Sequence, residues 1–228
     1  MVLIIKVAPD IRTLISQFLE FDSIYEAKQA LTILQKQRFV EWFSGDDIDL
    51  IWTKTNVSGA GVFAMVDAID EGFSIRTNTA VDSASQITFN NIRHYLETAC
   101  IAIWIGKNNR LVSGDVRFGF AGETNVLNPI NSAFAISQSS GGSFFDLTTK
   151  DATTGSTQAS SVALDALFHN HKTECRSADI QYTLDGVLEV TKTTNRPTAK
   201  MQPYFQATNG GGGGVNEGRA RYLEALST

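Results

Sequence analysis

The stretch Ala178–Thr193, ADIQYTLDGVLEVTKT, indicates the fold class of this 228-residue chain. Two runs of alternating apolar and polar residues meet at Asp185-Gly186. This dipeptide favours a two-residue type I′ turn, because both central residues of that turn need positive φ. In the first run, alternate apolar residues share one face: Ile180, Tyr182 and Leu184. The stretch therefore predicts a β-hairpin in an antiparallel sheet that is covered on one side.

Short apolar runs separated by Gly, Asn, Asp and Ser continue from Phe43 onward at intervals of about ten residues, which is typical of a sandwich or jelly roll. The run that begins at Cys100 is apolar on both faces and is expected to lie centrally, with Trp104 in the core. Two polar or glycine-rich segments are expected to be loops, Lys150–Ser161 and Gly210–Gly214. Strands are predicted over Cys100–Ile105, Val116–Ala121, Ala133–Gln138 and Ser143–Thr148.

The N-terminal segment, residues 1–42, has a different pattern. Apolar residues recur there at spacings of three and four, which indicates two short amphipathic helices, with Asp10 as one N-cap and Asp22 or Ser23 as the other. Each apolar stripe must cover either the β domain or another protein. We expect residues 1–42 to serve attachment or oligomerisation, and residues 43–228 to form the jelly-roll domain.

Composition limits the classes of function. A net charge of −5 and a pI near 5.2 argue against broad binding to nucleic acid, which needs a basic stripe. The first ten residues, MVLIIKVAPD, hold too few apolar positions for a secretory signal core or a membrane span. We therefore expect no membrane contact and synthesis in the cytoplasm.

The two cysteines, Cys100 and Cys175, both lie in strand-like sequence. Free cysteine is among the most buried residue types, so both are predicted to be small core residues. The alternative is a single disulfide between the sheets, which requires Cα atoms closer than about 7 Å.

Three segments together resemble a known superfamily: FSGDDIDLIW, GFSIRTN, and the long block HKTECRSADIQYTLDGVLEVTKTTNRPTAKMQPYFQATN. Between about Phe43 and Leu226 the chain resembles the concanavalin A-like lectin/glucanase superfamily. It looks most like the laminin-G-like jelly-roll modules of phage and other viral structural proteins. The resemblance implies a mainly β, two-sheet antiparallel sandwich. It also implies a role in glycan binding or in holding a virion or extracellular assembly together.

Catalysis is not expected. The glucanases of this superfamily carry a set of Glu and Asp residues along one face of a single strand, and retaining hydrolysis needs two carboxyl groups about 5–5.5 Å apart. The nearest acidic clusters here are Asp46 to Asp49 and Asp67 to Glu71, and neither has the required spacing. A GxSxG nucleophile motif and a phosphate-binding Lys-Ser/Thr are absent from the sequence as well.

Metal binding has one candidate site. Asp46, Asp47 and Asp49 could supply oxygen ligands to calcium, although a solvated acidic loop fits the same residues. His169 and His171 share a strand face, but no third zinc ligand is evident, which favours a polar strand edge or turn. We expect no cofactor other than calcium.

Sugar binding needs an aromatic platform with hydrogen-bonding groups beside it. The candidate ligand contacts are Tyr204, Asn209, Asn216 and Trp52. Tyr204 lies opposite the apolar face of its strand and is expected to be the best exposed aromatic, although a structural tyrosine fits the same position.

These observations predict a non-enzymatic virion structural protein, a capsid- or tail-associated module for assembly, decoration or surface attachment. Its partners would be other virion proteins and further copies of itself in a homo-oligomer. The alternative is a lectin-like module that binds host glycans, and a glycan hydrolase is a third, weaker alternative.

Overall fold

The computed structural model describes residues 38–44, 52–66, 71–89, 95–109, 114–122, 129, 131–138, 143–210 and 214–227. Within these ranges every helix or strand is a β-strand. The strands are β1 (Arg38–Trp42), β2 (Trp52–Ser58), β3 (Val62–Met65), β4 (Phe73–Arg76), β5 (Ala84–Phe89), β6 (Cys100–Asn108), β7 (Asp115–Ala121), β8 (Ser132–Gln138), β9 (Phe144–Lys150), β10 (Gly155–Ala163), β11 (His169–Cys175), β12 (Ile180–Leu184), β13 (Val187–Lys192), β14 (Gln202–Thr208) and β15 (Glu217–Ser227).

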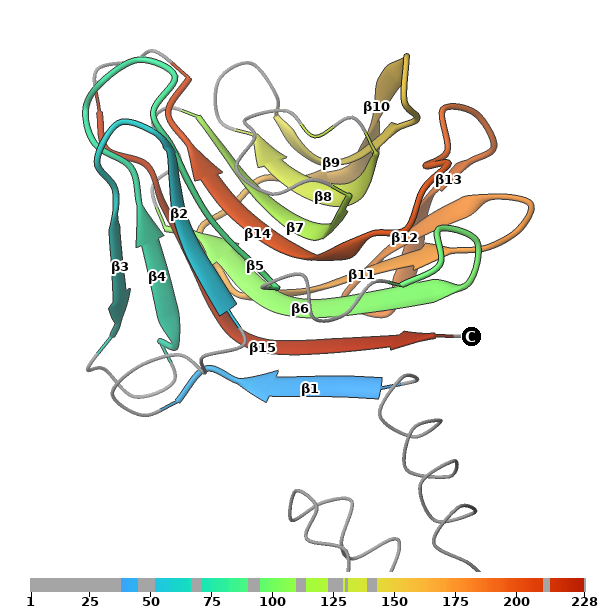
Figure 1. Ribbon diagram of the computed structural model, residues 1–228, viewed down its shortest axis with the longest axis horizontal. Coiled ribbons are helices and arrows are strands. Elements are labelled where there is room, and N and C mark those ends of the chain that lie inside the picture. The colour runs from blue at the N-terminus through green and yellow to red at the C-terminus, as the bar shows by residue number, and fades with distance from the viewer. Residues whose placement is uncertain are drawn as a thin grey trace, which may run out of the picture. The chain divides into compact units, whose positions relative to one another are not determined.

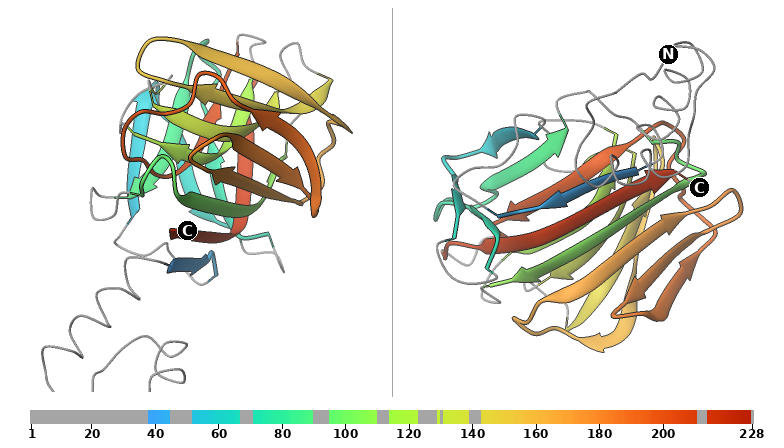
Figure 2. Two further views of the ribbon diagram at one scale, coloured as in Figure 1. Left: turned by 90° about the vertical axis from the view of Figure 1, so that its right-hand side faces the viewer. Right: turned by 90° about the horizontal axis from the view of Figure 1, so that it is seen from below.

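The strands form two antiparallel sheets that pack face to face (Figure 1). The seven-stranded sheet has the order β10-β9-β8-β7-β14-β5-β2. The eight-stranded sheet has the order β13-β12-β11-β6-β15-β4-β3, and β1 also pairs with β15 (Figure 2, right). In Figure 1 the strands of the seven-stranded sheet bend into a bowl that opens away from the other sheet. The predicted sandwich is confirmed.

The hairpin formed by β12 and β13 has the predicted turn. Asp185 and Gly186 both have positive φ, 49° and 87°, and Leu184 lies opposite Val187. The three alternate residues of β12 that were assigned to one face are all buried, with exposed fractions of 2% or less. The Asp185-Gly186 dipeptide therefore predicts correctly both the turn and the strand pairing next to it.

Aromatic side chains fill the space between the sheets. Trp104 of β6 is fully buried and packs against Phe43, Phe118 and Phe205, with ring centroids 5.8–6.2 Å apart. β6 lies between β11 and β15, so the prediction of a central strand there is confirmed. Burial of such large rings is the main source of stability for a sandwich of this size.

Both cysteines are fully buried and free, as predicted. They lie on β6 and β11, neighbouring strands of the eight-stranded sheet. The alternative of a bridge between the two sheets is therefore wrong.

Two other predictions about secondary structure need correction. The segment 150–161 was expected to be a loop, but β10 occupies its second half and pairs with β9 at the edge of the sheet. The first seven residues of β10 are small or polar on both faces, including the buried Ser160, so the sequence shows no apolar alternation there. β1 also lies inside the segment 1–42 that was assigned to helices. The two predicted helices and residues 211–213 of the glycine run lie outside the described residues.

Candidate functional site

The face of the seven-stranded sheet that points away from the core, here called the concave face, carries a group of polar side chains. On β7, Val116, Phe118 and Phe120 belong to the core, which places Arg117 on the opposite face. Strand pairing brings side chains from five strands onto this face: Gln86, Thr88, Arg117, Phe134, Asp146, Gln202, Tyr204 and Gln206.

A chain of hydrogen bonds crosses three neighbouring strands of this face, β7, β14 and β5. Gln206 of β14 lies directly between Gln86 of β5 and Arg117 of β7. Arg117 Nη1 donates to Gln206 Oε1 at 3.0 Å, and Gln206 Nε2 donates to Gln86 Oε1 at 3.0 Å. Arg117 Nη2 also pairs with Asp115 Oδ2 at 3.1 Å. Three long side chains are thereby held in fixed orientations.

Beside this chain lie an aromatic pair and a second carboxyl group. The rings of Tyr204 and Phe134 are 5.7 Å apart, and the Arg117 guanidinium lies 5.4 Å from the centre of the Phe134 ring. Asp146 of β9 is 7% exposed. Its pKa is raised, first because burial disfavours the charged carboxylate and second because Asp115 is negatively charged.

Several buried polar atoms on the concave face have no hydrogen-bond partner within the protein. They include Thr88 Oγ1, Tyr204 Oη and both amide atoms of Gln202. The three side chains are fully buried. Burial raises the pKa of Tyr204, and the positive charge of the nearby Arg117 opposes this. An unsatisfied buried polar group costs about 1–3 kcal/mol, so the face would gain stability from a ligand that supplies hydroxyl groups.

The predicted sugar contacts lie elsewhere or are covered. Trp52 packs in the core against Phe89, with 6% of its surface exposed. The amide of Asn209 donates to two backbone carbonyls at 3.1 Å, and that of Asn216 donates to two more at 2.9 and 3.0 Å. These side chains therefore hold loops in place. Tyr204 lies on the predicted face, but the expectation that it is exposed is wrong, since its exposed fraction is 0%.

Sequence reasoning did not select Gln86, Gln206 or Asp146. The alternation of residues along β7 and β14 does assign Arg117 and Gln206 to the face opposite the core. This alternation is the sequence pattern that could have identified them.

The predicted calcium ligands Asp46, Asp47 and Asp49 lie outside the described residues. Within the residues that the structure describes, no group of three or more His, Cys, Asp and Glu side chains is placed to hold a metal ion. His169 instead lies between two carboxylates, with Nε2 2.8 Å from Asp165 and Nδ1 2.5 Å from Asp185. Burial lowers its pKa, but these two partners outweigh burial and raise it.

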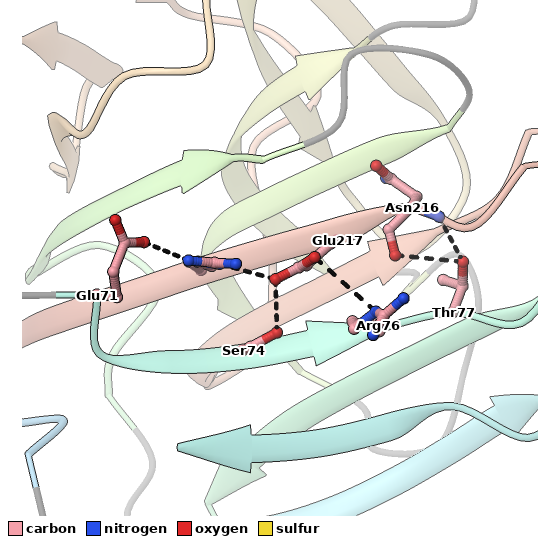
Figure 3. Close-up of polar contacts among 7 residues, drawn as sticks. Glu71, Ser74, Arg76, Thr77, Asn216 and Glu217 are labelled. Atoms are coloured by element: carbon pink, nitrogen blue, oxygen red, sulfur yellow. Dashed lines mark hydrogen bonds and ion pairs between the residues drawn. The ribbon is translucent and has the colours of Figure 1, made fainter. Parts of the chain in front are cut away.

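An ionic network on the outer face of the eight-stranded sheet is the other dense polar cluster (Figure 3). Glu217 is 5% exposed and accepts from Ser74 Oγ at 3.1 Å and from Arg219 Nε at 2.7 Å. Arg219 also pairs with Glu71, which in turn contacts Lys107 Nζ at 2.8 Å. The hydrogen bond from Lys107 is the main cause that lowers the pKa of Glu71. Because its charges are paired, this network ties β4 to β15 and offers little to a ligand.

Comparison with known proteins gives structural neighbours only. No protein-family model matches the sequence, and no curated protein matches it. The carbohydrate recognition domain of Emp47p is 8% identical and has a TM-score of 0.60, over 84% of this chain and 95% of that one. The Bacillus licheniformis β-glucanase is 12% identical with a TM-score of 0.58, over 84% and 99%. Rv0315, a pseudo β-1,3-glucanase of Mycobacterium tuberculosis, is 16% identical with a TM-score of 0.56, over 85% and 99%.

The fold is that of the concanavalin A-like lectins and glucanases. At these identities the likeness shows the fold, which supports many functions. The resemblance predicted from sequence is confirmed as a fold, whereas the viral context stays a prediction. Among the described residues there is no helix that is long and apolar enough to cross a bilayer.

Proposed function

We propose that this protein binds glycans through the concave face of its seven-stranded sheet and does not cleave them. The observation that carries the proposal is the set of unsatisfied buried polar atoms on that face, those of Thr88, Tyr204 and Gln202. Sugar hydroxyls both donate and accept hydrogen bonds, so they match this mixture of hydroxyl and amide groups. The Tyr204 and Phe134 rings, 5.7 Å apart, add apolar surface beside them.

The structural neighbours support the same proposal. They include a carbohydrate recognition domain, a β-glucanase and a pseudo β-1,3-glucanase, and the names of all three refer to carbohydrates. Since the polar atoms of the concave face are covered in the free protein, a glycan must displace the groups above them. We therefore expect association to be slower than encounter by diffusion.

Calorimetric titration of the full chain tests the proposal, with a panel of oligosaccharides that includes β-1,3-glucan fragments. Gln202→Leu and Tyr204→Phe remove unsatisfied polar atoms while keeping most of the side-chain volume. We expect each variant to weaken binding about tenfold, the effect of losing one hydrogen bond of about 1.4 kcal/mol. Folding stability should stay the same or rise, because a buried unsatisfied group is lost.

Tyr182→Phe is the matched control. Tyr182 is an equally buried tyrosine, but its hydroxyl lies 2.9 Å from His171 Nδ1, on the other sheet. The variant should lose stability and keep its glycan affinity. Unchanged affinity in both concave-face variants, or an equal loss in the control, would contradict binding on this face.

Hydrolysis is the second candidate, and one observation favours it. Asp115 and Asp146 lie close enough on the concave face for the charge of one to raise the pKa of the other, as in acid/base pairs of glycosidases. We favour binding without cleavage because Asp115 is ion-paired to Arg117 at 3.1 Å, which weakens it as a nucleophile. Release of reducing sugar from the same panel, abolished in Asp146→Asn, would establish the hydrolase instead.

The role in a virion remains a prediction of the sequence alone. It is compatible with glycan binding, since a surface-attached module can do both. The mass of the native chain in solution, measured by light scattering over a concentration series, tests the assembly part. A stable ring or trimer would support it, and a monomer at every concentration would count against it.

A further inference from the structure

Cys100 and Cys175 form a pair across two neighbouring strands of the eight-stranded sheet. Cys100 is the first residue of β6, Cys175 is the last residue of β11, and the register places them directly opposite each other. Both are free thiols with fully buried side chains. No other cysteine occurs in the chain, so each thiol has a single intramolecular partner.

The geometry of this pair meets the requirement for a disulfide. Directly opposite residues on antiparallel strands have Cα atoms about 4.5 or 5.5 Å apart, depending on the type of pair. Disulfides need a Cα separation of about 4.4–6.8 Å, so both pair types satisfy it without movement of the strands. The two side chains lie on the same face of the sheet, and both belong to the buried core.

We propose that Cys100 and Cys175 form an intramolecular disulfide when the chain meets an oxidising low-molecular-weight disulfide. One thiolate attacks the small disulfide, forms a mixed disulfide and releases one small thiol. The second cysteine then attacks the protein sulfur of that mixed disulfide and releases the other small thiol. The two cysteines are oxidised and lose two protons, and the small disulfide is reduced to two thiols.

The surroundings of the pair determine how fast this happens. The interaction with Cys175, together with burial, raises the pKa of the Cys100 thiol well above its ordinary value, so little thiolate is present at neutral pH. Both residues end their strands, where local opening is easiest. A cleft of about 530 Å³ offers a route to this end of the sheet, because it is lined by Thr98, two residues before Cys100, and by Arg176, directly after Cys175. Oxidation should therefore be slow and should accelerate with rising pH.

The bridge should stabilise the fold. It would close a loop of about 75 residues and restrict the unfolded chain, which for this loop length and domain size corresponds to a rise in Tm of roughly 5–15 °C. It would also fasten β11 to β6 near the end of the sheet.

The test equilibrates the full chain in mixtures of oxidised and reduced glutathione, both as the native protein and during refolding. Denaturation in maleimide followed by intact-mass measurement counts the free thiols. We expect the oxidised sample to have no maleimide adduct, no glutathione adduct and a mass about two hydrogens lower than the reduced chain. Its Tm should be higher, and dithiothreitol should reverse both changes.

Cys175→Ala is the control, because the remaining Cys100 can only form a mixed disulfide or a dimer. Two free thiols after refolding in oxidised glutathione would overturn the proposal. Stable glutathione adducts on the wild-type chain, disulfide-linked dimers, or a bridge that lowers Tm would overturn it as well.

Discussion

The buried side chain of His171 makes the free energy of unfolding depend on pH. It is fully buried, stacks on Phe118 with ring centroids 4.9 Å apart, and has Nδ1 2.9 Å from the hydroxyl of Tyr182. Burial, and then the positive charge of His169, lowers the pKa of His171 to about 3. The folded protein therefore keeps this imidazole neutral where the unfolded chain, with a pKa near 6.5, binds a proton.

The consequence is a loss of stability in mild acid. Because the unfolded state binds the proton first, the contribution of His171 is complete above pH 6.5 and declines as the pH falls toward 3. Between pH 7 and pH 5 the free energy of unfolding should drop by about 2 kcal/mol on account of this residue. Urea denaturation at the two pH values measures it.

His171→Phe is the reference for this measurement, because it removes the titrating group and keeps a ring of similar size. His169 acts in the opposite direction: its pKa is raised, so its contribution is present at low pH and is lost as the pH rises. Wild type and variant share the contribution of His169, so the difference between their changes in unfolding free energy from pH 7 to pH 5 is the contribution of His171. An identical pH dependence in the two proteins would show that His171 does not titrate as described.

At the scale of elements, two glycines are needed for different reasons. One is needed for its positive φ alone, and the other also because a Cβ would collide with its surroundings. Gly186 in the β12–β13 turn has φ +87°, and a Cβ there would meet nothing within 4 Å. Gly114 before β7 has φ +90°, but a Cβ there would lie 1.8 Å from the Thr208 carbonyl oxygen. We expect Gly186→Ala to cost about 1 kcal/mol and Gly114→Ala at least 3 kcal/mol. Urea denaturation measures both losses of unfolding free energy. Equal losses in the two variants would show that the space around Gly114 does not matter.

The joint between β4 and β15 depends on a buried carboxylate. Replacing Glu217 with Gln removes the charge that Arg219 and Arg76 share, and leaves the guanidinium groups less well paired (Figure 3). Breaking a buried pair costs about 3–5 kcal/mol, which is an upper limit here because Arg76 is 43% exposed.

Glu174→Gln is the matched control, because Glu174 pairs with Lys172 at 2.7 Å where both side chains are more accessible. Its loss should cost less than about 1 kcal/mol. Comparable thermal shifts for the two variants would show that the network does not tie the strands together.

Sequence predicts the elements well where the signal is local. The hairpin at Asp185-Gly186 and the central strand β6 follow from a turn dipeptide and from an apolar run, and both are confirmed. β10 was missed because its residues from Gly155 to Ser161 are small or polar on both faces, so no apolar residue marks the inward face. The polar chain of Gln86, Arg117 and Gln206 could not be found, because three strands far apart in sequence supply it and only their pairing brings them together.

At the scale of the whole domain, the two sheets have different outer faces. The eight-stranded sheet carries the Glu71–Arg219–Glu217 network, in which the charges are paired. The concave face of the other sheet carries buried polar atoms that the protein leaves unsatisfied. This asymmetry supports the proposed glycan site on the seven-stranded sheet, where the sequence indicated Tyr204 but not the polar residues around it.

The most direct test is to map backbone amide chemical shifts by NMR while an oligosaccharide that the protein binds is titrated into the full chain. The account predicts that the largest changes fall on β5, β7 and β14, at residues such as Thr88, Arg117 and Gln206, which lie together on the concave face. Changes confined to the eight-stranded sheet, or no saturable change with any member of the panel, would contradict the proposed glycan site.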